Sequence, residues 1–224
     1  MTDATVRPRA DLRPGSIGIM GGTFDPIHIG HLAAAEEAYE ALGFERVLFI
    51  PAGIPPLKPG RRITRARDRV AMVELAIAGN PAFELSPIEV DRPGESFTVD
   101  TVALLTDAEQ AAGRAPDITV IVSGESLRSL PRWHEPHRLL ELCRLAVVPR
   151  DGFEMPDRSW VGAEFPGCED RIVFLDAPRL RLSATEIRAR VAAGRSIRYL
   201  VPDAVIRYIG DHDLYTNRGG RPVE

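Results

Sequence analysis

The sequence predicts an α/β protein with a Rossmann-like, doubly wound parallel sheet and a helical C-terminal segment. Short apolar runs alternate with stretches at helical spacing, as is typical of βαβ units that build a parallel sheet. The run 118–122 consists of β-branched residues, as expected for a strand buried on both faces. The chain has 224 residues without an internal repeat, so one domain is the simplest organisation.

Apolar spacing, and the glycine or proline that ends each element, predict the first two strands and the helix between them. The run 17–20 predicts a strand that stops at a glycine pair. Residues 30–42 predict a helix, because their apolar members recur near helical spacing. Gly43 follows as a C-cap, and the run 47–50 predicts a second strand that Pro51 closes.

The middle of the chain predicts two more helices around an extended segment. Residues 66–78 form the first helix, which ends before Asn80 and the proline after it. Residues 83–90 are extended and lead through a polar loop into a helix at 97–112. Gly113 ends that helix.

The second half continues the alternation and closes on helices. In order, it predicts a strand at 118–122, short helices within 125–142, strands at 145–148 and 172–175, and helices at 184–193 and 202–210. Residues 150–170 are rich in Gly, Pro and charge and predict an irregular excursion. Ligands of such sheets bind at the carboxyl ends of strands, which directs attention to the loops after strands one, two, four and six.

Composition excludes several classes of protein. Lys and Arg number 28 against 32 Asp and Glu, so the chain lacks the basic balance of proteins that bind nucleic-acid backbones. No apolar run is long enough to span a membrane. Cys143 and Cys168 lack any CxxC context, which argues against a zinc site or disulfide framework and favours a reducing compartment.

The chain ends are expected to lie outside the folded part. Residues 1–14 are polar, contain two prolines and lack the apolar core of a signal peptide. We expect a disordered leader there, a single domain at 15–215 and a tail at 216–224, in a cytoplasmic protein.

The loop after the first strand carries the strongest functional signal. It reads GGTFDPIHIGH at 21–31. The glycines allow a ligand to approach the backbone, and the following helix start offers free N–H groups to anions. His28 and His31 share one helix face and can donate hydrogen bonds to phosphate. Capping or core histidines are the ordinary alternative, and a metal site lacks an obvious third ligand.

This string contains the HIGH motif of the nucleotidyltransferase superfamily, and it closely resembles the bacterial nicotinate-nucleotide adenylyltransferase family. The resemblance implies that His28 and His31 are the catalytic residues and contact the phosphates of ATP. It implies further ATP contacts from four residues of the same loop, namely Gly21, Gly22, Thr23 and Phe24. Asp25 is expected to bind the second substrate.

The string RLSATEIR at 181–188 is the second signal. Ser183, followed three residues later by a glutamate, fits a capping box, and a plain cap is the ordinary interpretation. Beside the first loop, the string resembles the family's second phosphate motif, with a leucine in place of its first isoleucine. The resemblance implies that Ser183, Thr185 and Arg188 hold the triphosphate. The segment 196–202 also resembles the family's C-terminal part.

Two further segments resemble the family's pyridine-binding loops. ESFTVDT at 95–101 and LPRWH at 130–134 imply that Thr98, Trp133 and His134 lie at the nicotinate end of the substrate. Trp133 offers a large flat face for stacking. The alternative is an ordinary core or surface tryptophan.

Two positions depart from the family pattern. Leu57 stands where the family often has a phosphate-binding histidine, which leaves that contact to Lys58 or a nearby arginine. In the segment SGESL, Glu125 replaces the usual aspartate. Its side chain is one methylene longer than that of aspartate, and we expect its carboxylate to accept hydrogen bonds from the ribose hydroxyls of ATP.

The resemblance implies transfer of adenylyl from ATP to nicotinate mononucleotide, giving deamido-NAD and pyrophosphate. Mg²⁺ is expected on the phosphates, with no protein metal ligand. Another acceptor, such as nicotinamide mononucleotide or phosphopantetheine, and a nucleotide-binding regulator without catalysis stay open. A class I synthetase fragment is disfavoured, because no KMSKS-like string follows. We expect no nucleic-acid or membrane partner, and a homo-oligomer is left open.

Overall fold

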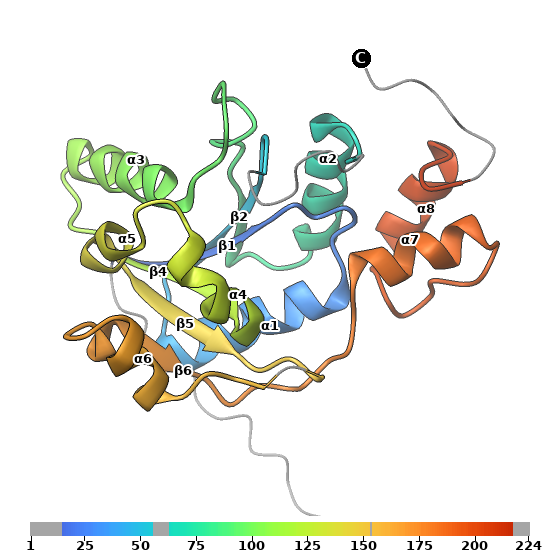
Figure 1. The fold of residues 1–224 in the computed structure, drawn as a ribbon. Helices are drawn as coiled ribbons and strands as arrows, with labels where there is room; N and C mark the ends of the chain where they lie inside the picture. Colours follow the sequence, from blue (N-terminus) through green and yellow to red (C-terminus); the bar gives the residue numbers. More distant parts are fainter. Residues whose placement is uncertain (1–14, 56–62, 153, 217–224) are drawn as a thin grey trace, which may run out of the picture.

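Six parallel strands form one sheet in the order β3-β2-β1-β4-β5-β6 in the computed structural model of this chain, which describes residues 15–55, 63–152 and 154–216 (Figure 1). The strands are β1 (Ser16–Gly22), β2 (Arg46–Pro51), β3 (Phe83–Leu85), β4 (Asp117–Ser123), β5 (Arg144–Val148) and β6 (Ile172–Phe174). The order runs outward from β1 in one direction and from β4 in the other. The predicted doubly wound parallel sheet is therefore confirmed.

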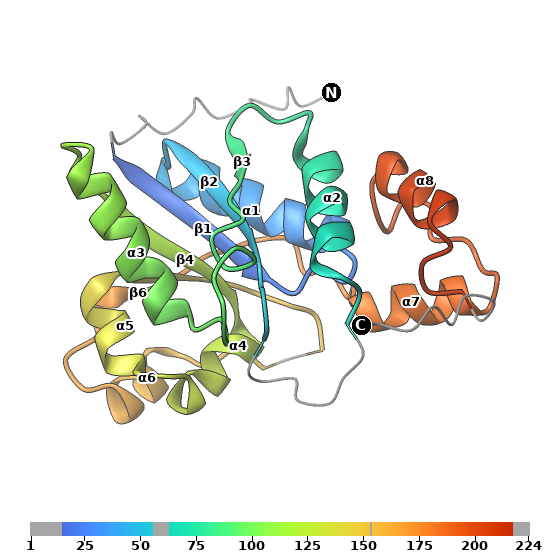
Figure 2. The ribbon, with the colours of Figure 1, turned by 90° about the horizontal axis from the view of Figure 1, so that it is seen from above.

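Helices cover both faces of this sheet (Figure 2). The helices are α1 (Ile29–Leu42), α2 (Ala66–Ile77), α3 (Thr98–Ala111), α4 (Gly124–Ser129), α5 (Pro136–Leu142), α6 (Arg158–Glu164), α7 (Ala184–Ala192) and α8 (Asp203–Asp211). Buried residues of α1, α2, α7 and α8 share one hydrophobic cluster, and those of α3 to α6 share the other. Each cluster packs against its own face of the strands.

The central strand β1 shows how the sequence divides between the two faces. Ile17 and Ile19 belong to one buried cluster and Met20 to the other, as the alternation of a strand requires. Gly18 lies against the Phe44 ring, where an added Cβ would come within 2.7 Å of a ring carbon. Glycine at this position therefore lets Phe44 pack on the sheet.

The C-terminal helices α7 and α8 stand together at one end of the sheet, beside α2 (Figures 1 and 2). Val205 and Ile209 are the buried face of α8. The Tyr208 hydroxyl donates to Asp68 Oδ1 at 2.9 Å, which ties α8 to α2. The predicted helical C-terminal segment is thus confirmed, and it is bonded to the core of the fold.

Two details of the sequence prediction were wrong. The strand expected at 83–90 ends at Leu85, because the chain then turns, with the Asp91 N–H donating to the Pro87 carbonyl. The excursion at 150–170 contains α6, whose start is capped by the Asp157 carboxylate accepting from the Trp160 N–H at 2.9 Å.

The expected leader at 1–14 lies outside the described residues, as does the tail beyond Thr216. Lys58 and Leu57 also lie outside them. Within the described parts of the chain, no helix is both long and apolar enough to cross a membrane.

Candidate functional site

The candidate site lies where β1 and β4 end side by side. These two strands pair in parallel, and β1 leads into α1 while β4 leads into α4. The order of strands reverses between them, and ligands of open α/β sheets bind at such a point. The loop that the sequence singled out is therefore at the expected edge of the sheet.

His28 and His31 stack on each other at the start of α1. Their ring centroids are 3.6 Å apart, with planes inclined by 21°. The His28 backbone N–H donates to His31 Nδ1 at 3.2 Å. Since Nδ1 accepts this bond, a neutral His31 carries its proton on Nε2. The prediction that both imidazoles share one face is confirmed.

His28 is a buried, neutral imidazole at physiological pH. The residue is 7% exposed, and burial, with the positive charge of Arg150 as a second cause, lowers its pKa to about 4. Its Nδ1 atom is buried with no hydrogen-bond partner among the described residues. A buried polar atom without a partner is costly, and its burial places Nδ1 out of reach of a ligand.

The glycines beside the histidines differ in what surrounds them. Gly21 faces open space, because an added Cβ would meet nothing within 4 Å. At Gly22 a Cβ would lie 3.0 Å from the Phe24 ring, and at Gly30 it would lie 3.1 Å from His28 Nδ1. Phe24 itself is 2% exposed. Its side chain belongs to the core, so any ATP contact that it makes comes from its backbone.

The second motif meets the first one across a large separation in sequence. Arg188 Nη1 donates to the Asp25 carbonyl at 2.6 Å, although 163 residues separate the two. Arg188 Nη2 donates to Thr185 Oγ1 at 3.2 Å. Ser183 precedes α7 and accepts the Glu186 N–H at 3.2 Å, which confirms its predicted cap. The starts of α1 and α7, which carry the two predicted phosphate motifs, therefore both lie at the loop 21–31.

Glu125 forms an ion pair with an arginine that the sequence did not single out. Its Oε2 lies 3.1 Å from Arg150 Nη1, and Arg150 Nη2 donates to the Leu182 carbonyl at 2.8 Å. Arg150 thus joins the end of β4 to the second motif, beside His28. Its position just after a buried strand was the only signal in the sequence.

The two predicted pyridine-binding segments lie next to each other. The Phe97 ring lies on His134, with centroids 4.3 Å apart, and Thr98 begins α3 directly after Phe97. Trp133 is half-buried, and its Nε1 donates to Ser129 Oγ at 3.0 Å. The hydrogen bond to Ser129 therefore fixes the orientation of the Trp133 indole.

The support of this region comes from close contact between two loops. The Ser96 hydroxyl accepts the Gly53 N–H at 3.0 Å. A Cβ at Gly53 would lie 2.3 Å from the Glu89 carbonyl oxygen, so only glycine fits. The buried Glu89 carboxylate accepts from the Thr101 hydroxyl at 2.7 Å, and burial raises its pKa. These bonds hold the start of α3 in place.

Asp25, predicted to bind substrate, is buried and already bonded within the protein. It is 4% exposed. Tyr215 donates to Oδ1 at 2.7 Å, and the Thr64 N–H donates to Oδ2 at 3.3 Å. The nearby Arg69 is 2% exposed. Sequence reasoning missed Arg69 and Tyr215, although Arg69 is a charged residue four positions before Val73, on the buried face of its helix.

No dedicated metal site is seen in the part of the chain that the structure describes. There, no three His, Cys, Asp or Glu side chains gather closely enough to hold an ion.

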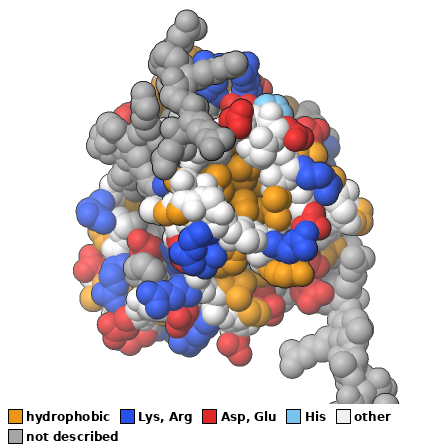
Figure 3. Space-filling model, turned by 90° about the vertical axis from the view of Figure 1, so that its right-hand side faces the viewer, with side chains coloured by type: hydrophobic (Ala, Val, Ile, Leu, Met, Phe, Trp, Pro, Cys, Tyr) orange, Lys and Arg blue, Asp and Glu red, His pale blue; other side chains and the backbone are white. Residues whose placement is uncertain are grey.

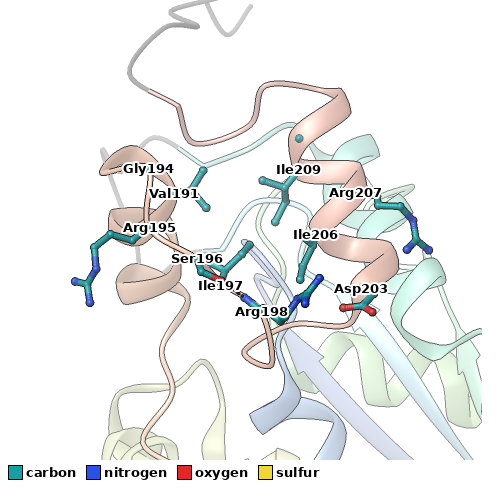
Figure 4. Close-up of a pocket in the computed structure, with 11 residues that line it drawn as sticks. Val191, Gly194, Arg195, Ser196, Ile197, Arg198, Asp203, Ile206, Arg207 and Ile209 are labelled. Carbon is teal, nitrogen blue, oxygen red and sulfur yellow. Dashed lines mark hydrogen bonds between the residues drawn. The ribbon is translucent and has the colours of Figure 1, made fainter.

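A groove of about 680 Å³ lies away from the histidines, between α7 and α8 (Figure 4). Apolar Val191, Ile197, Ile206 and Ile209 line it, together with Arg195, Arg198 and Arg207. Hydrophobic side chains flanked by basic ones are visible on this side of the molecule (Figure 3). Because no residue of either phosphate motif lines it, we place the chemistry at the histidine pair.

Comparison with known proteins gives consistent matches. Residues 19–190 match the family model described as cytidylyltransferase-like. A probable nicotinate-nucleotide adenylyltransferase of Roseiflexus sp. (strain RS-1) is 48% identical over 89% of this chain and 97% of that protein. A protein of the same description from Thermomicrobium roseum is 46% identical over 89% and 91%.

A solved structure with the same fold comes from Plasmodium falciparum. It is the nicotinic acid mononucleotide adenylyltransferase complexed with NaAD, with a TM-score of 0.74 at 17% identity. The match covers 89% of this chain and 97% of that one. At this identity the likeness concerns the fold alone.

Proposed function

Because the chain belongs to the nicotinate-nucleotide adenylyltransferase family, we propose that its two joined motifs bind the phosphates of ATP during adenylyl transfer. The enzyme transfers adenylyl from ATP to nicotinate mononucleotide, which gives deamido-NAD and pyrophosphate in NAD biosynthesis. The individual roles below are derived from the positions of the side chains.

The reaction does not require a general base from the protein. A phosphate oxygen of nicotinate mononucleotide attacks the α-phosphorus of ATP, and the bond to the β-phosphate oxygen breaks as pyrophosphate leaves. The second pKa of a phosphate monoester is near 6, so the nucleophile is already ionised at neutral pH. The protein therefore has to align the two negatively charged substrates and to stabilise the charge on the transferred phosphoryl group in the transition state.

His28 and His31 donate to the ATP phosphates in this proposal. A neutral imidazole has one N–H donor, and the low pKa of His28 in the ligand-free protein leaves it neutral, with one N–H, before ATP binds. Gly21, Gly22, Thr23 and Phe24 contribute backbone groups beside it. The N-terminal end of α1 adds the positive end of its dipole.

The second motif supplies the remaining charge. The Ser183 hydroxyl accepts a backbone bond and keeps its own proton to donate to phosphate. Thr185 and the remaining N–H groups of Arg188 contact the triphosphate in this proposal. Lys58, which lies outside the described residues, is expected to add its charge. Glu125 accepts from the ribose hydroxyls of ATP, with Arg150 holding its carboxylate.

The pyridine nucleotide binds at the neighbouring loops. We assign stacking of the nicotinate ring to Trp133. Ser129 holds its Nε1 atom, and the flat indole face can stack on an aromatic ring. Thr98 and His134 lie beside it at the start of α3. Asp25 acts from within the protein rather than as a direct ligand.

Magnesium enters with the substrate. The described residues offer no carboxylate cluster, and Mg²⁺ commonly stays on phosphates and water. We therefore assign Mg²⁺ to ATP itself and name no protein ligand.

One observation carries the proposal, namely the 2.6 Å bond from Arg188 to the Asp25 carbonyl, which brings both motifs to one loop. The test is pyrophosphate release from ATP with nicotinate mononucleotide, nicotinamide mononucleotide and phosphopantetheine as separate acceptors. We expect the fastest pyrophosphate release with nicotinate mononucleotide. Release only with another acceptor, or with none, would contradict the proposal.

We also expect the enzyme to work in the cytoplasm without a nucleic-acid partner. Cys143 and Cys168 are free thiols, and burial raises the pKa of Cys143 to about 12, so that thiol is inert. The net charge of −4 gives no support for binding to a nucleic-acid backbone.

A further inference from the structure

The end of the described chain reaches back to the loop that carries the histidines. Tyr215 follows α8, and its hydroxyl donates to Asp25 Oδ1 at 2.7 Å across 190 residues of sequence. Asp25 lies three residues before His28. This contact links the residue that follows α8 directly to the phosphate loop.

Other groups hold the same loop at several points. Arg69 Nη1 donates to the Thr23 carbonyl at 2.9 Å, and the Arg188 guanidinium donates to the Asp25 carbonyl. The Ile29 N–H donates to the Leu200 carbonyl at 3.0 Å. These three bonds fix the backbone on either side of His28. The Asp25 carboxylate is held by the Tyr215 hydroxyl and the Thr64 N–H.

The Asp25 carboxylate needs donors because it is 4% exposed. A buried carboxylate that loses a donor keeps a desolvation cost, and we expect Asp25 to shift toward its remaining donors. Burial raises the pKa of Tyr215, and the Asp25 charge raises it further. The phenol therefore stays protonated and donates throughout the working pH range.

We infer that Tyr215 is a positioning residue for adenylyl transfer, whose hydroxyl fixes Asp25 and thereby the loop that presents His28. This inference rests on the proposed function, since it assumes that the loop binds the phosphates of ATP. It assigns Tyr215 to the reaction, although it follows the last helix of the fold.

The same segment contains a matched control. Tyr208 makes the same kind of bond, with its hydroxyl donating to Asp68 Oδ1 at 2.9 Å. Asp68 is also buried, at 7% exposure, but it lies on α2 and not on the phosphate loop. Removing either hydroxyl costs one Tyr–Asp bond, and only one of the two bonds reaches the loop.

The experiment compares Tyr215→Phe with Tyr208→Phe in the full chain. We expect both variants to lower the thermal midpoint to a similar extent. Tyr215→Phe should reduce kcat about tenfold, since misplacing reacting groups by about 1 Å can cost about 10²-fold. Its KM for both substrates should change less than about twofold, as for an interaction made in the transition state. Tyr208→Phe should keep the wild-type kcat.

Equal kcat values in the two variants would overturn the inference, and so would a Tyr215→Phe variant altered in KM alone. If Tyr215→Phe does not fold, 4-aminophenylalanine and 4-methylphenylalanine at position 215 replace it. Only the first donates a hydrogen bond, so equal kcat values for that pair would also overturn the inference. Wild-type chain that releases no pyrophosphate would instead contradict the proposed function, and the inference with it.

Discussion

The imidazole of His31 accepts a hydrogen bond from the backbone N–H of His28, while the two rings stack with centroids 3.6 Å apart. The Phe24 ring packs nearly perpendicular to His31, with centroids 5.0 Å apart and planes inclined by 83°, so His31 is held on two sides. Both imidazoles therefore have one fixed orientation before any ligand arrives. Such preorganised donors stabilise transition-state charge without reorganising.

His28→Ala should fold normally and lose about 10² to 10³ in kcat, which is typical of removing one transition-state donor. The reason is that His28 stacks on His31 at the start of α1, where the proposal has both imidazoles donate to the phosphates of ATP. Steady-state pyrophosphate release measures the effect, and thermal unfolding checks the fold. A well-folded variant with wild-type turnover would refute the assigned role.

The stability of the protein should depend on His28 at acid pH. Its pKa falls from 6.5 in the unfolded chain to about 4 in the folded one. Between these values the unfolded chain binds the extra proton, so the free energy of unfolding decreases as the pH falls from 6.5 toward about 4. The full loss amounts to about 3 kcal/mol at about 1.4 kcal/mol per pH unit.

The measurement is urea unfolding of wild-type and His28→Gln chains at about pH 7 and pH 4. Glutamine does not titrate, so the variant should lose about 3 kcal/mol less on acidification. Carboxylates shared by both chains cancel in the difference. Equal losses in the two chains would show that His28 is not held neutral by the fold.

The sequence predicted the fold well because each element carries its own local signal. The run at 118–122 and the αL glycine Gly43, with φ of 65°, both stand where expected. The misses occurred where tertiary contacts decide the structure. The strand at Phe83–Leu85 stops early because the chain turns away. Helix α6 forms within a polar stretch because Val161 is buried.

The motifs predicted the place of the site, and its supports could not be predicted. His28, His31 and Arg188 stand in recognisable strings, and the structure brings them to one loop. Arg150 and Tyr215 stand in no such string. Their contacts with Leu182 and Asp25 cross 32 and 190 residues of sequence, and local spacing does not reveal such pairs.

Trp133→Ala should raise the KM for nicotinate mononucleotide about tenfold and leave the KM for ATP unchanged. A base–aromatic stack contributes about 1 to 3 kcal/mol, and Ser129 holds the Trp133 indole. Trp160→Ala is the control, since Trp160 lies in α6 and, like Trp133, packs against the cluster of the same sheet face. An unchanged KM for nicotinate mononucleotide in Trp133→Ala would reject the stacking role.

Gly30→Ala should separate stability from activity. Gly30 is the second residue of α1, and alanine is the stronger helix former of the two residues, so the variant should remain folded. Its new Cβ, however, would lie 3.1 Å from His28 Nδ1 and 3.6 Å from Leu182 Cβ. The His28 ring must therefore shift by a few tenths of an ångström, and we expect kcat to fall about tenfold.

The control for this variant is Gly210→Ala in α8, where an added Cβ meets nothing within 4 Å. It makes the same glycine-to-alanine change near a helix end without a neighbour to displace, so its kcat should equal that of the wild type. Thermal unfolding and pyrophosphate release are measured on both variants. A Gly30→Ala enzyme with wild-type kcat would contradict the expectation that a shift of the His28 ring slows the transfer.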